Sequence, residues 1–213
     1  MTTEAAPGVA AFDFDGTLVP GDSLAPFLLR LLGRPGFARA MSRSSPAMLA
    51  RYRREGRDGA KAALLARTLA GCNAAEVEAA GRRYGTQLVT RIRPAMGRRI
   101  DWHRHEGHRL VLVSASLAVY LEPWGEAMGF DAVIATRLEV GASGQLTGLL
   151  AGANVRAGEK ARLLTACLAA RGWTGVELWA YGDSAGDREL LAMADHPRLL
   201  PPPRPWRRPT PPE

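Results

Sequence analysis

From residue 96 onward, short apolar runs alternate with amphipathic helical segments, and this rhythm constrains the fold more than any other feature of the chain. The apolar runs lie at 110–113, 132–135 and 176–181. The helical segments around them span 96–106, 117–128 and 159–171. Strands that alternate with helices are typical of a parallel sheet with helices on both faces. We therefore expect an α/β fold with a Rossmann-like parallel sheet as its core.

A further apolar run, residues 9–12, stands apart from this alternation. It is followed by helical patterns at 24–32, 47–54, 60–69 and 74–90, which are separated by glycines and prolines. A helical insertion directly after the first strand would lie over the carboxyl ends of the strands, where open α/β sheets bind ligands. We expect residues 8–19 and 94–200 to form the core, and residues 20–93 to form an inserted helical cap.

Positive charge is concentrated in the expected cap. The whole chain carries a formal net charge of +7, whereas residues 20–95 contain 14 Arg or Lys and five Asp or Glu, a net of +9. Such a segment can raise the local concentration of an anionic ligand. The alternative, that these arginines are simply solvated helix faces, stays open. The basic residues lack interleaved aromatics and form no known nucleic-acid motif, so we expect no nucleic-acid partner.

The two ends of the sequence indicate where the protein resides. Residues 1–7 contain an acidic residue and no basic segment, a composition that argues against a signal peptide. The longest uncharged apolar stretch, 110–121, is too short to span a bilayer. We therefore expect a cytoplasmic protein without a transmembrane segment. Residues 201–213 are rich in proline and arginine, and we expect them to form a flexible tail.

Two acids, Asp13 and Asp15, follow the first apolar run in the sequence Asp-Phe-Asp-Gly-Thr. Residues two apart in an extended chain point the same way, so both carboxylates can face one cleft. Gly16 allows the chain to turn sharply beside a ligand. Two carboxylates this close repel each other unless a divalent cation lies between them or one holds a proton. Both conditions suit phosphoryl transfer, in which one carboxylate attacks phosphorus and the other protonates the leaving oxygen.

Later elements carry four more candidate residues. Ser114 follows the run at 110–113, and its hydroxyl can donate to a phosphoryl oxygen. Asp183 and Asp187 follow the last apolar run, and their carboxylates are the hard oxygen ligands that suit Mg²⁺. Lys160 opens a helical segment, and its compact ammonium can neutralise phosphate and carboxylate together. Taken singly, each has a simpler explanation, respectively a local turn, a helix cap and an exposed helix-start lysine.

Taken together, these residues resemble the four ordered motifs of the haloacid dehalogenase (HAD) superfamily. The motifs are Asp13-x-Asp15-Gly-Thr-Leu, Ser114 after a strand, Lys160, and Gly182-Asp183-(x)₃-Asp187. The helical insertion after the first motif is similar to the cap of subfamily IB, the phosphoserine-phosphatase-like hydrolases. The resemblance covers about residues 8–200 and implies a HAD-like core.

The resemblance also implies a role for each residue. Asp13 would be the nucleophile, Asp15 the general acid and base, and Ser114 a phosphate ligand. Lys160 would stabilise charge and contact the phosphate. The expected metal site consists of Asp13, the Asp15 backbone carbonyl, Asp183 and Asp187, with Mg²⁺ as cofactor. ATPase-type members carry Thr at the position of Asp15, so retaining Asp favours rapid hydrolysis of an aspartyl-phosphate.

The expected function is therefore a Mg²⁺-dependent phosphomonoester hydrolase that forms an aspartyl-phosphate on a small phosphorylated substrate. Three departures separate the chain from phosphoserine phosphatases: Asp22 stands where they carry a substrate-binding Glu, Ala115-Ser116 replaces a glycine pair, and Gly186 replaces an Asn. The substrate can thus be phosphoserine-like or another metabolite. Two alternatives stay open, a phosphatase of anionic phospholipid head groups and a phosphotransferase whose acceptor is not water.

Overall fold

A computed structural model describes residues 8–201, apart from the side chains of residues 43–45. The flexible tail expected at 201–213 lies, beyond its first residue, outside the described residues. In the described part of the chain, no helix combines the length and the apolar character that a bilayer crossing requires.

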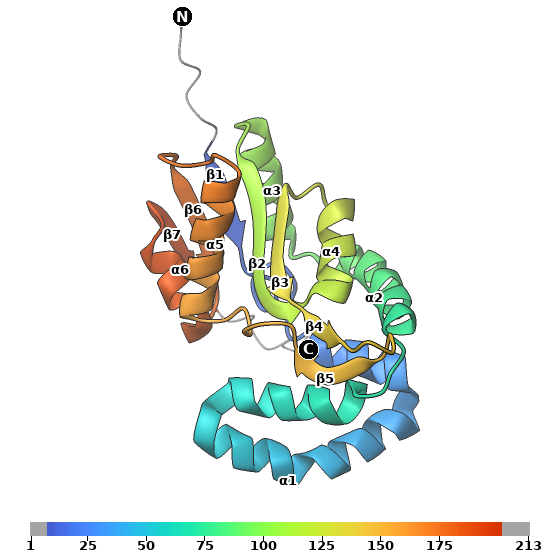
Figure 1. Cartoon of the computed structure of the whole chain (residues 1–213). Coiled ribbons are helices and arrows are strands. Elements are labelled where there is room, and N and C mark those ends of the chain that lie inside the picture. The colour runs from blue at the N-terminus through green and yellow to red at the C-terminus, as the bar shows by residue number, and fades with distance from the viewer. Residues whose placement is uncertain (1–7, 202–213) are drawn as a thin grey trace, which may run out of the picture.

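The core is a five-stranded parallel sheet with the strand order β3-β2-β1-β6-β7 (Figure 1). Its strands are β1 (Val9–Phe12), β2 (Arg109–Leu117), β3 (Ala132–Thr136), β6 (Leu178–Gly182) and β7 (His196–Leu199). The central strand β1 is buried at all four positions, because helices cover both faces of the sheet. The expected α/β fold with a Rossmann-like parallel sheet is confirmed.

Helices cover the two faces of this sheet in separate groups. Val9 and Ala11 of β1 pack in a cluster with residues of α5 and α6, whereas Ala10 and Phe12 pack with residues of α2, α3 and α4. This division follows from the two-residue period of a strand, which points successive side chains to opposite faces. The helices are α2 (Ala74–Leu88), α3 (Pro94–His105), α4 (Ala118–Ala127), α5 (Gly158–Ala170) and α6 (Arg188–Ala192), with short 3₁₀ turns η1 (Val89–Arg91) and η2 (Ala185–Asp187).

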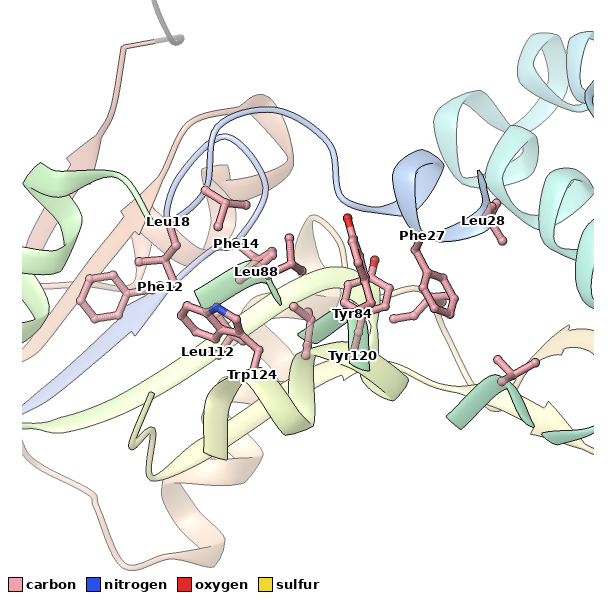
Figure 2. Close-up of a cluster of buried hydrophobic side chains, with 14 of the residues drawn as sticks. Phe12, Phe14, Leu18, Phe27, Leu28, Tyr84, Leu88, Leu112, Tyr120 and Trp124 are labelled. Carbon is pink, nitrogen blue, oxygen red and sulfur yellow. The ribbon is translucent and has the colours of Figure 1, made fainter. Parts of the chain in front are cut away.

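Aromatic side chains connect the sheet to the inserted helices, as Figure 2 shows. Phe14 packs edge-on against Trp124, with ring centroids 4.9 Å apart. Beyond this pair, Tyr120 lies 5.4 Å from Tyr84 and 5.1 Å from Phe27. All five side chains are at least 97% buried. The start of the insertion is therefore anchored to α2 and α4 by the same hydrophobic core that supports the sheet.

The inserted helix α1 (Leu24–Leu69) folds back on itself below the sheet in Figure 1. Its helical path is interrupted at Gly33 (φ 66°) and Gly56 (φ 65°), where the backbone adopts left-handed values that favour glycine. Both glycines mark breaks between the predicted helical patterns. The predicted patterns left out residues 34–46, which are also helical in the structure. Pro35 is compatible with a helix here because it lies in the first turn of the new segment, where no N–H is needed.

The structure adds details that the sequence pattern did not specify. The expected excursion at 138–149 is an antiparallel hairpin of β4 (Leu138–Val140) and β5 (Leu146–Leu150). The last segment of α1 lies on this hairpin, where a Cβ on Gly148 would come within 2.9 Å of the Ala66 Cα. The edge strand β7 was not predicted, because its residues are exposed and include Pro197. The domain limits 20–93 and 94–200 remain predictions.

A histidine and aromatic cluster lies at the amino ends of the strands, away from the carboxyl edge. His103 Nε2 lies 2.9 Å from the Tyr181 hydroxyl, and its Nδ1 lies 2.8 Å from His108 Nδ1. Burial, with the nearby His108 and Arg99, lowers the pKa of His103 from 6.5 to about 3. His103 is therefore neutral in the folded protein at neutral pH.

We expect this neutral histidine to destabilise the fold as the pH falls from 6.5 towards 3, because the unfolded chain then binds a proton that the native state does not. The contribution of His103 to the free energy of unfolding is fully present above pH 6.5. Below that pH it decreases by up to about 1.4 kcal/mol per pH unit. Urea unfolding of wild type and His103→Gln between pH 7.5 and pH 4.5 measures the difference in slope (about one proton). The exposed His105→Gln is the matched control. Parallel stability curves for wild type and His103→Gln would contradict the expectation.

Candidate active site

The candidate residues from the sequence converge at the carboxyl edge of the sheet. β1 is paired with β2 on one side and with β6 on the other, so the loops that follow these strands leave the sheet together. They border a cleft of about 340 Å³, which residues of the insertion and of the segment before α5 complete. The candidates that line this cleft are Asp13, Asp15, Asp22, Ser114, Lys160, Asp183 and Asp187.

Lys160 lies between two carboxylates at the base of this cleft. Its Nζ donates to Asp13 Oδ1 at 2.5 Å and to Asp187 Oδ1 at 2.6 Å. Burial alone would lower the pKa of Lys160, but the two carboxylates outweigh burial and raise it. The lysine therefore keeps its charge. The alternative of an exposed lysine at a helix start is wrong, since the side chain is 3% exposed.

Three acids form a cluster that fits a divalent cation. Asp13, Asp183 and Asp187 each offer a carboxylate oxygen, and these oxygens lie within 4.8 Å of one another. Burial, together with repulsion from the other two acids, raises the pKa of Asp183 to about 6. A cation among the three carboxylates would offset this repulsion, and hard carboxylate oxygens are ligands that Mg²⁺ accepts. The residues present thus suit Mg²⁺ by their chemistry and their proximity.

Asp187 has a structural role in addition to any contact with a cation. Its Oδ1 accepts from Lys160, and its Oδ2 accepts from the Asp183 N–H at 3.2 Å, the Ser184 N–H at 3.0 Å and the Ser184 hydroxyl at 2.9 Å. Together with Ser184 it forms a capping box around η2. These bonds hold the loop that carries Asp183. Its assignment as a metal ligand stays a prediction.

Gly16 allows the first loop to approach Asp183 closely. Its φ is 79°, and a Cβ at this position would lie 2.0 Å from Asp183 Oδ2. A side chain at position 16 would therefore push the Asp183 carboxylate away from the first loop. On the other side of the loop, the Thr17 hydroxyl donates to Asp13 Oδ2 at 3.1 Å. The tight first loop therefore brings the backbone beside Asp15 next to the acidic cluster.

Asp15 is held by one carboxylate oxygen and leaves the other free. Its Oδ2 accepts from the Ser116 hydroxyl at 2.5 Å and from the Ser23 hydroxyl at 3.0 Å. Its Oδ1 is buried and has no hydrogen-bond partner among the described residues. Burial raises the pKa of Asp15 to about 7, although the two serines oppose the shift. A carboxyl group with this pKa can both donate and accept a proton near neutral pH.

Ser114 and Asp22 both line the cleft but differ in exposure. Ser114 is 1% exposed, and its oxygen accepts from the Ser116 N–H at 3.1 Å, which leaves its hydroxyl hydrogen for another acceptor. Asp22 is exposed at the entrance to α1, where its Oδ2 accepts from the Ala25 N–H at 2.9 Å. Asp22 therefore stabilises the first turn of α1 while it borders the cleft.

The chain is similar to one known protein family over most of its length. Residues 10–192 match the haloacid dehalogenase-like hydrolases. This chain belongs to that family. The resemblance that the four motifs indicated is therefore confirmed, and so is the expectation of an enzyme.

Individual relatives of this hydrolase cover most of its length. The protein CicA of Caulobacter vibrioides is 35% identical over 192 residues, which are 89% of this chain and 84% of CicA. A protein of unknown function from Bordetella pertussis has a similar structure, with a TM-score of 0.71, 25% identity and coverage of 88% and 87% of the two chains. A phosphoserine phosphatase in its apo form has the same fold, with a TM-score of 0.60, 21% identity and coverage of 88% and 83%.

Two serines that position Asp15 in this hydrolase were missed as site residues from the sequence. Ser116 lies at the end of β2, two residues after Ser114, and Ser23 lies directly before α1. Their hydroxyls lie 3.1 Å apart, and Ser23 is also 3.1 Å from the Tyr120 hydroxyl. The two-residue spacing from Ser114 was a signal for Ser116. Ser23 carried no such signal, since its contact with Asp15 depends on the path of the loop between them.

Two arginines also line the cleft and were not singled out from the sequence. Arg57 comes from α1 and Arg156 from the segment before α5. Arg156 packs over Gly186, where a Cβ would lie 3.2 Å from the Arg156 Nε. Gly186 stands where phosphoserine phosphatases carry an Asn, so the smaller residue leaves room for a guanidinium. The cleft is therefore lined by two cationic groups as well as by the exposed Asp22.

Proposed function

We propose that this hydrolase is a Mg²⁺-dependent phosphomonoesterase that transfers the phosphoryl group of a small phosphorylated metabolite first to Asp13 and then to water. One observation carries the proposal. A carboxylate held by Lys160, Asp13, shares a cleft with Asp15, whose Oδ1 is buried and unpartnered among the described residues. An ester cleavage of this type requires at least a nucleophile and a proton donor, each held in place by its own neighbouring groups.

In the first step, a carboxylate oxygen of Asp13 attacks phosphorus and the bond from phosphorus to the ester oxygen breaks. Asp15, protonated at its free Oδ1, gives its proton to the departing oxygen, so that an alcohol leaves. The raised pKa of Asp15, about 7, keeps part of the enzyme in the required protonated form at neutral pH. The products of this step are the alcohol, a phosphoryl group on Asp13 and an ionised Asp15.

In the second step, the ionised Asp15 takes a proton from a water molecule that attacks the phosphorus of phosphorylated Asp13. The acyl-phosphate bond breaks, inorganic phosphate is released, and Asp13 returns to its carboxylate form. Asp15 ends the cycle protonated, as it began. The Ser23 and Ser116 hydroxyls hold its Oδ2 throughout, so that Oδ1 keeps its direction in both steps.

The negative charge of the phosphate is offset by groups around Asp13. We assign this role to the Lys160 ammonium, which already contacts Asp13, and to the hydroxyl of the buried Ser114. A Mg²⁺ ion held by Asp13, Asp183 and the Asp15 backbone carbonyl, with Asp187 in support, would supply Lewis-acid stabilisation of the phosphoryl oxygens.

The composition of the cleft mouth favours a leaving group that carries negative charge. Arg57 and Arg156 line this region, and Asp22 adds a single carboxylate beside them. A phosphorylated acid, with or without an amine, matches this set of charges. A phosphorylated sugar with a neutral leaving group brings no negative charge to these two guanidinium groups, so we expect it to be a poorer substrate.

A screen of phosphorylated metabolites with purified wild-type protein in Mg²⁺ tests this function. We expect turnover of p-nitrophenyl phosphate and a higher kcat/KM for a phosphorylated acid than for a sugar phosphate of similar size. Removal of the metal with EDTA should lower turnover at least about 100-fold, and added Mg²⁺ should restore it. Phosphate release that is unaffected by EDTA would contradict the metal assignment, and no phosphate release from any ester would contradict the function.

A further inference from the structure

Lys61, on the last segment of α1, is a partly buried cation that the proposed mechanism does not use. It is one of two lysines in the chain, and the other, Lys160, contacts Asp13. The Lys61 Nζ donates to the backbone carbonyl of Ala115 and, at 2.6 Å, to Asn154 Oδ1. Ala115 and Asn154 belong to the core, whereas Lys61 belongs to the inserted helix. This lysine therefore joins the insertion to the end of β2 and to the segment before α5.

Asn154 is the centre of this junction. Its Oδ1 accepts from Lys61 and, at 3.0 Å, from the Thr136 hydroxyl at the end of β3. Its Nδ2 donates to Asp58 Oδ1 at 2.8 Å, and Asp58 Oδ2 lies 3.9 Å from Arg156. Asp58 and Lys61 are three residues apart on one helix, so they face the same side and both form hydrogen bonds with Asn154. Cap and core are thus linked through both ends of one amide.

The two core segments held in this way, the end of β2 and the chain leading into α5, carry candidate substrate-binding residues. Ala115 directly follows Ser114, and its carbonyl points to Lys61. Asn154 lies two residues before Arg156 and six before Lys160. We propose, resting on the proposed function, that Lys61 is a positioning residue: by fixing the Ala115 carbonyl and Asn154 from the inserted helix, it holds Ser114 and Arg156 in the geometry that binds the phosphorylated substrate.

The electrostatic environment of Lys61 indicates that its charge does not serve stability. Burial lowers its pKa from 10.5 to about 8, although Asp58, Asp15 and Asp22 partly oppose the shift. Arg156, beside Asp58, is the nearest cation with a defined position in this junction. A group with a lowered pKa binds its proton more weakly in the folded state, so the charged lysine opposes folding at neutral pH. A charged side chain that opposes folding in this way is consistent with a role in activity.

The test compares Lys61→Met with Arg67→Met, which removes an exposed cation from the same helix. For Lys61→Met we expect kcat/KM for p-nitrophenyl phosphate to fall roughly 10-fold to 100-fold, mostly through KM. The inhibition constant of inorganic phosphate should rise by a similar factor. The midpoint of thermal unfolding should change little, because relief of the lysine's desolvation offsets the hydrogen bonds that Ala115 and Asn154 lose. Arg67→Met should match wild type in all three measurements.

A pH profile separates positioning from a merely structural role. With p-nitrophenyl phosphate, whose leaving group needs no proton from Asp15, kcat/KM of the wild type should fall above about pH 8 as Lys61 loses its proton and its contact with Ala115. This fall should be absent from Lys61→Met. A folded Lys61→Met with the wild-type KM, phosphate inhibition and alkaline fall would overturn the proposal. If Lys61→Met does not fold, Asp58→Asn, at a half-exposed position, should still raise KM, and an unchanged KM would overturn it.

Hydrogen exchange gives a readout that does not depend on turnover. Loss of the Lys61 contacts should increase exchange at the backbone amides of residues 114–117 and 154–157, relative to wild type and to Arg67→Met. Unchanged exchange in both segments would overturn the positioning role even if the protein hydrolyses no phosphate ester. Failure of the proposed function is recognised separately, as absence of phosphate release by the wild-type enzyme.

Discussion

The variant Asp13→Asn is expected to fold normally and to lose turnover of p-nitrophenyl phosphate by roughly 10⁴-fold to 10⁶-fold. An amide cannot attack phosphorus, so no phosphorylated intermediate can form. The fold should persist because the Asn oxygen can still accept a hydrogen bond from Lys160 or Thr17, which contact the two oxygens of Asp13. Steady-state kinetics with far-ultraviolet circular dichroism of the same preparation measures both parts of the expectation.

The matched control for this variant is Asp101→Asn. Asp101 is exposed and forms an ion pair with Arg104 on α3, so the same chemical change there should leave kcat and KM at their wild-type values. Substantial turnover by a correctly folded Asp13→Asn would assign the nucleophile to another group. A phosphoryl adduct found on any residue other than Asp13 after rapid acid quenching of wild type would contradict the assignment directly.

The second large effect is expected for Asp15→Asn, whose turnover should fall roughly 10²-fold to 10⁴-fold. The loss should divide unequally between the two steps. Nitrophenolate leaves without needing a proton, so the first step should remain fast with p-nitrophenyl phosphate. The second step needs a base to activate water and should become slow. We therefore expect a burst of about one nitrophenolate per enzyme, followed by a stalled steady state.

Quenched-flow measurement followed by mass spectrometry should find the phosphoryl group on Asp13 of the stalled Asp15→Asn protein. An alkyl phosphate, whose leaving oxygen does need a proton, should give no burst with this variant. Ser116→Ala is the graded comparison: it keeps the acid but removes one of the two hydroxyls that hold Asp15 Oδ2, and should lose less activity than Asp15→Asn. Equal bursts with both substrates would exclude Asp15 as the proton donor.

The parts of the site that could be predicted from the sequence are those that a strand end determines. Asp13, Ser114 and Asp183 each follow an apolar run, and parallel pairing of β1 with β2 and β6 brings such positions to one edge. The residue types at these positions, two carboxylates and a hydroxyl, then indicate which reactions the site can catalyse. The sheet itself could be predicted for the same reason, because buried strands give continuous apolar runs, whereas the exposed strand β7 gives none.

The missed residues depend on contacts between distant parts of the chain. Lys61 meets Ala115 and Asn154, which lie 54 and 93 positions away, and nothing in the helical pattern of α1 indicates which loop it will reach. Ser23 meets Ser116 across 93 positions. Helix breaks at Gly33 and Gly56 could be predicted, but the direction in which each segment continues is set by packing on the β4–β5 hairpin and on α2.

The amide of Asn154 restricts how this hydrolase can be rebuilt by exchanging segments with its relatives. A chimera that takes residues 57–69 from a relative with other residues at positions 58 and 61 would lose both sets of contacts at once. The Asn154 amide, which is partly buried, and the Ala115 carbonyl would then have fewer hydrogen-bond partners, at a cost typical of unsatisfied polar groups. We therefore expect that this helical segment cannot be transplanted alone. A graft must carry complementary residues at positions 58, 61 and 154 to give an active hybrid.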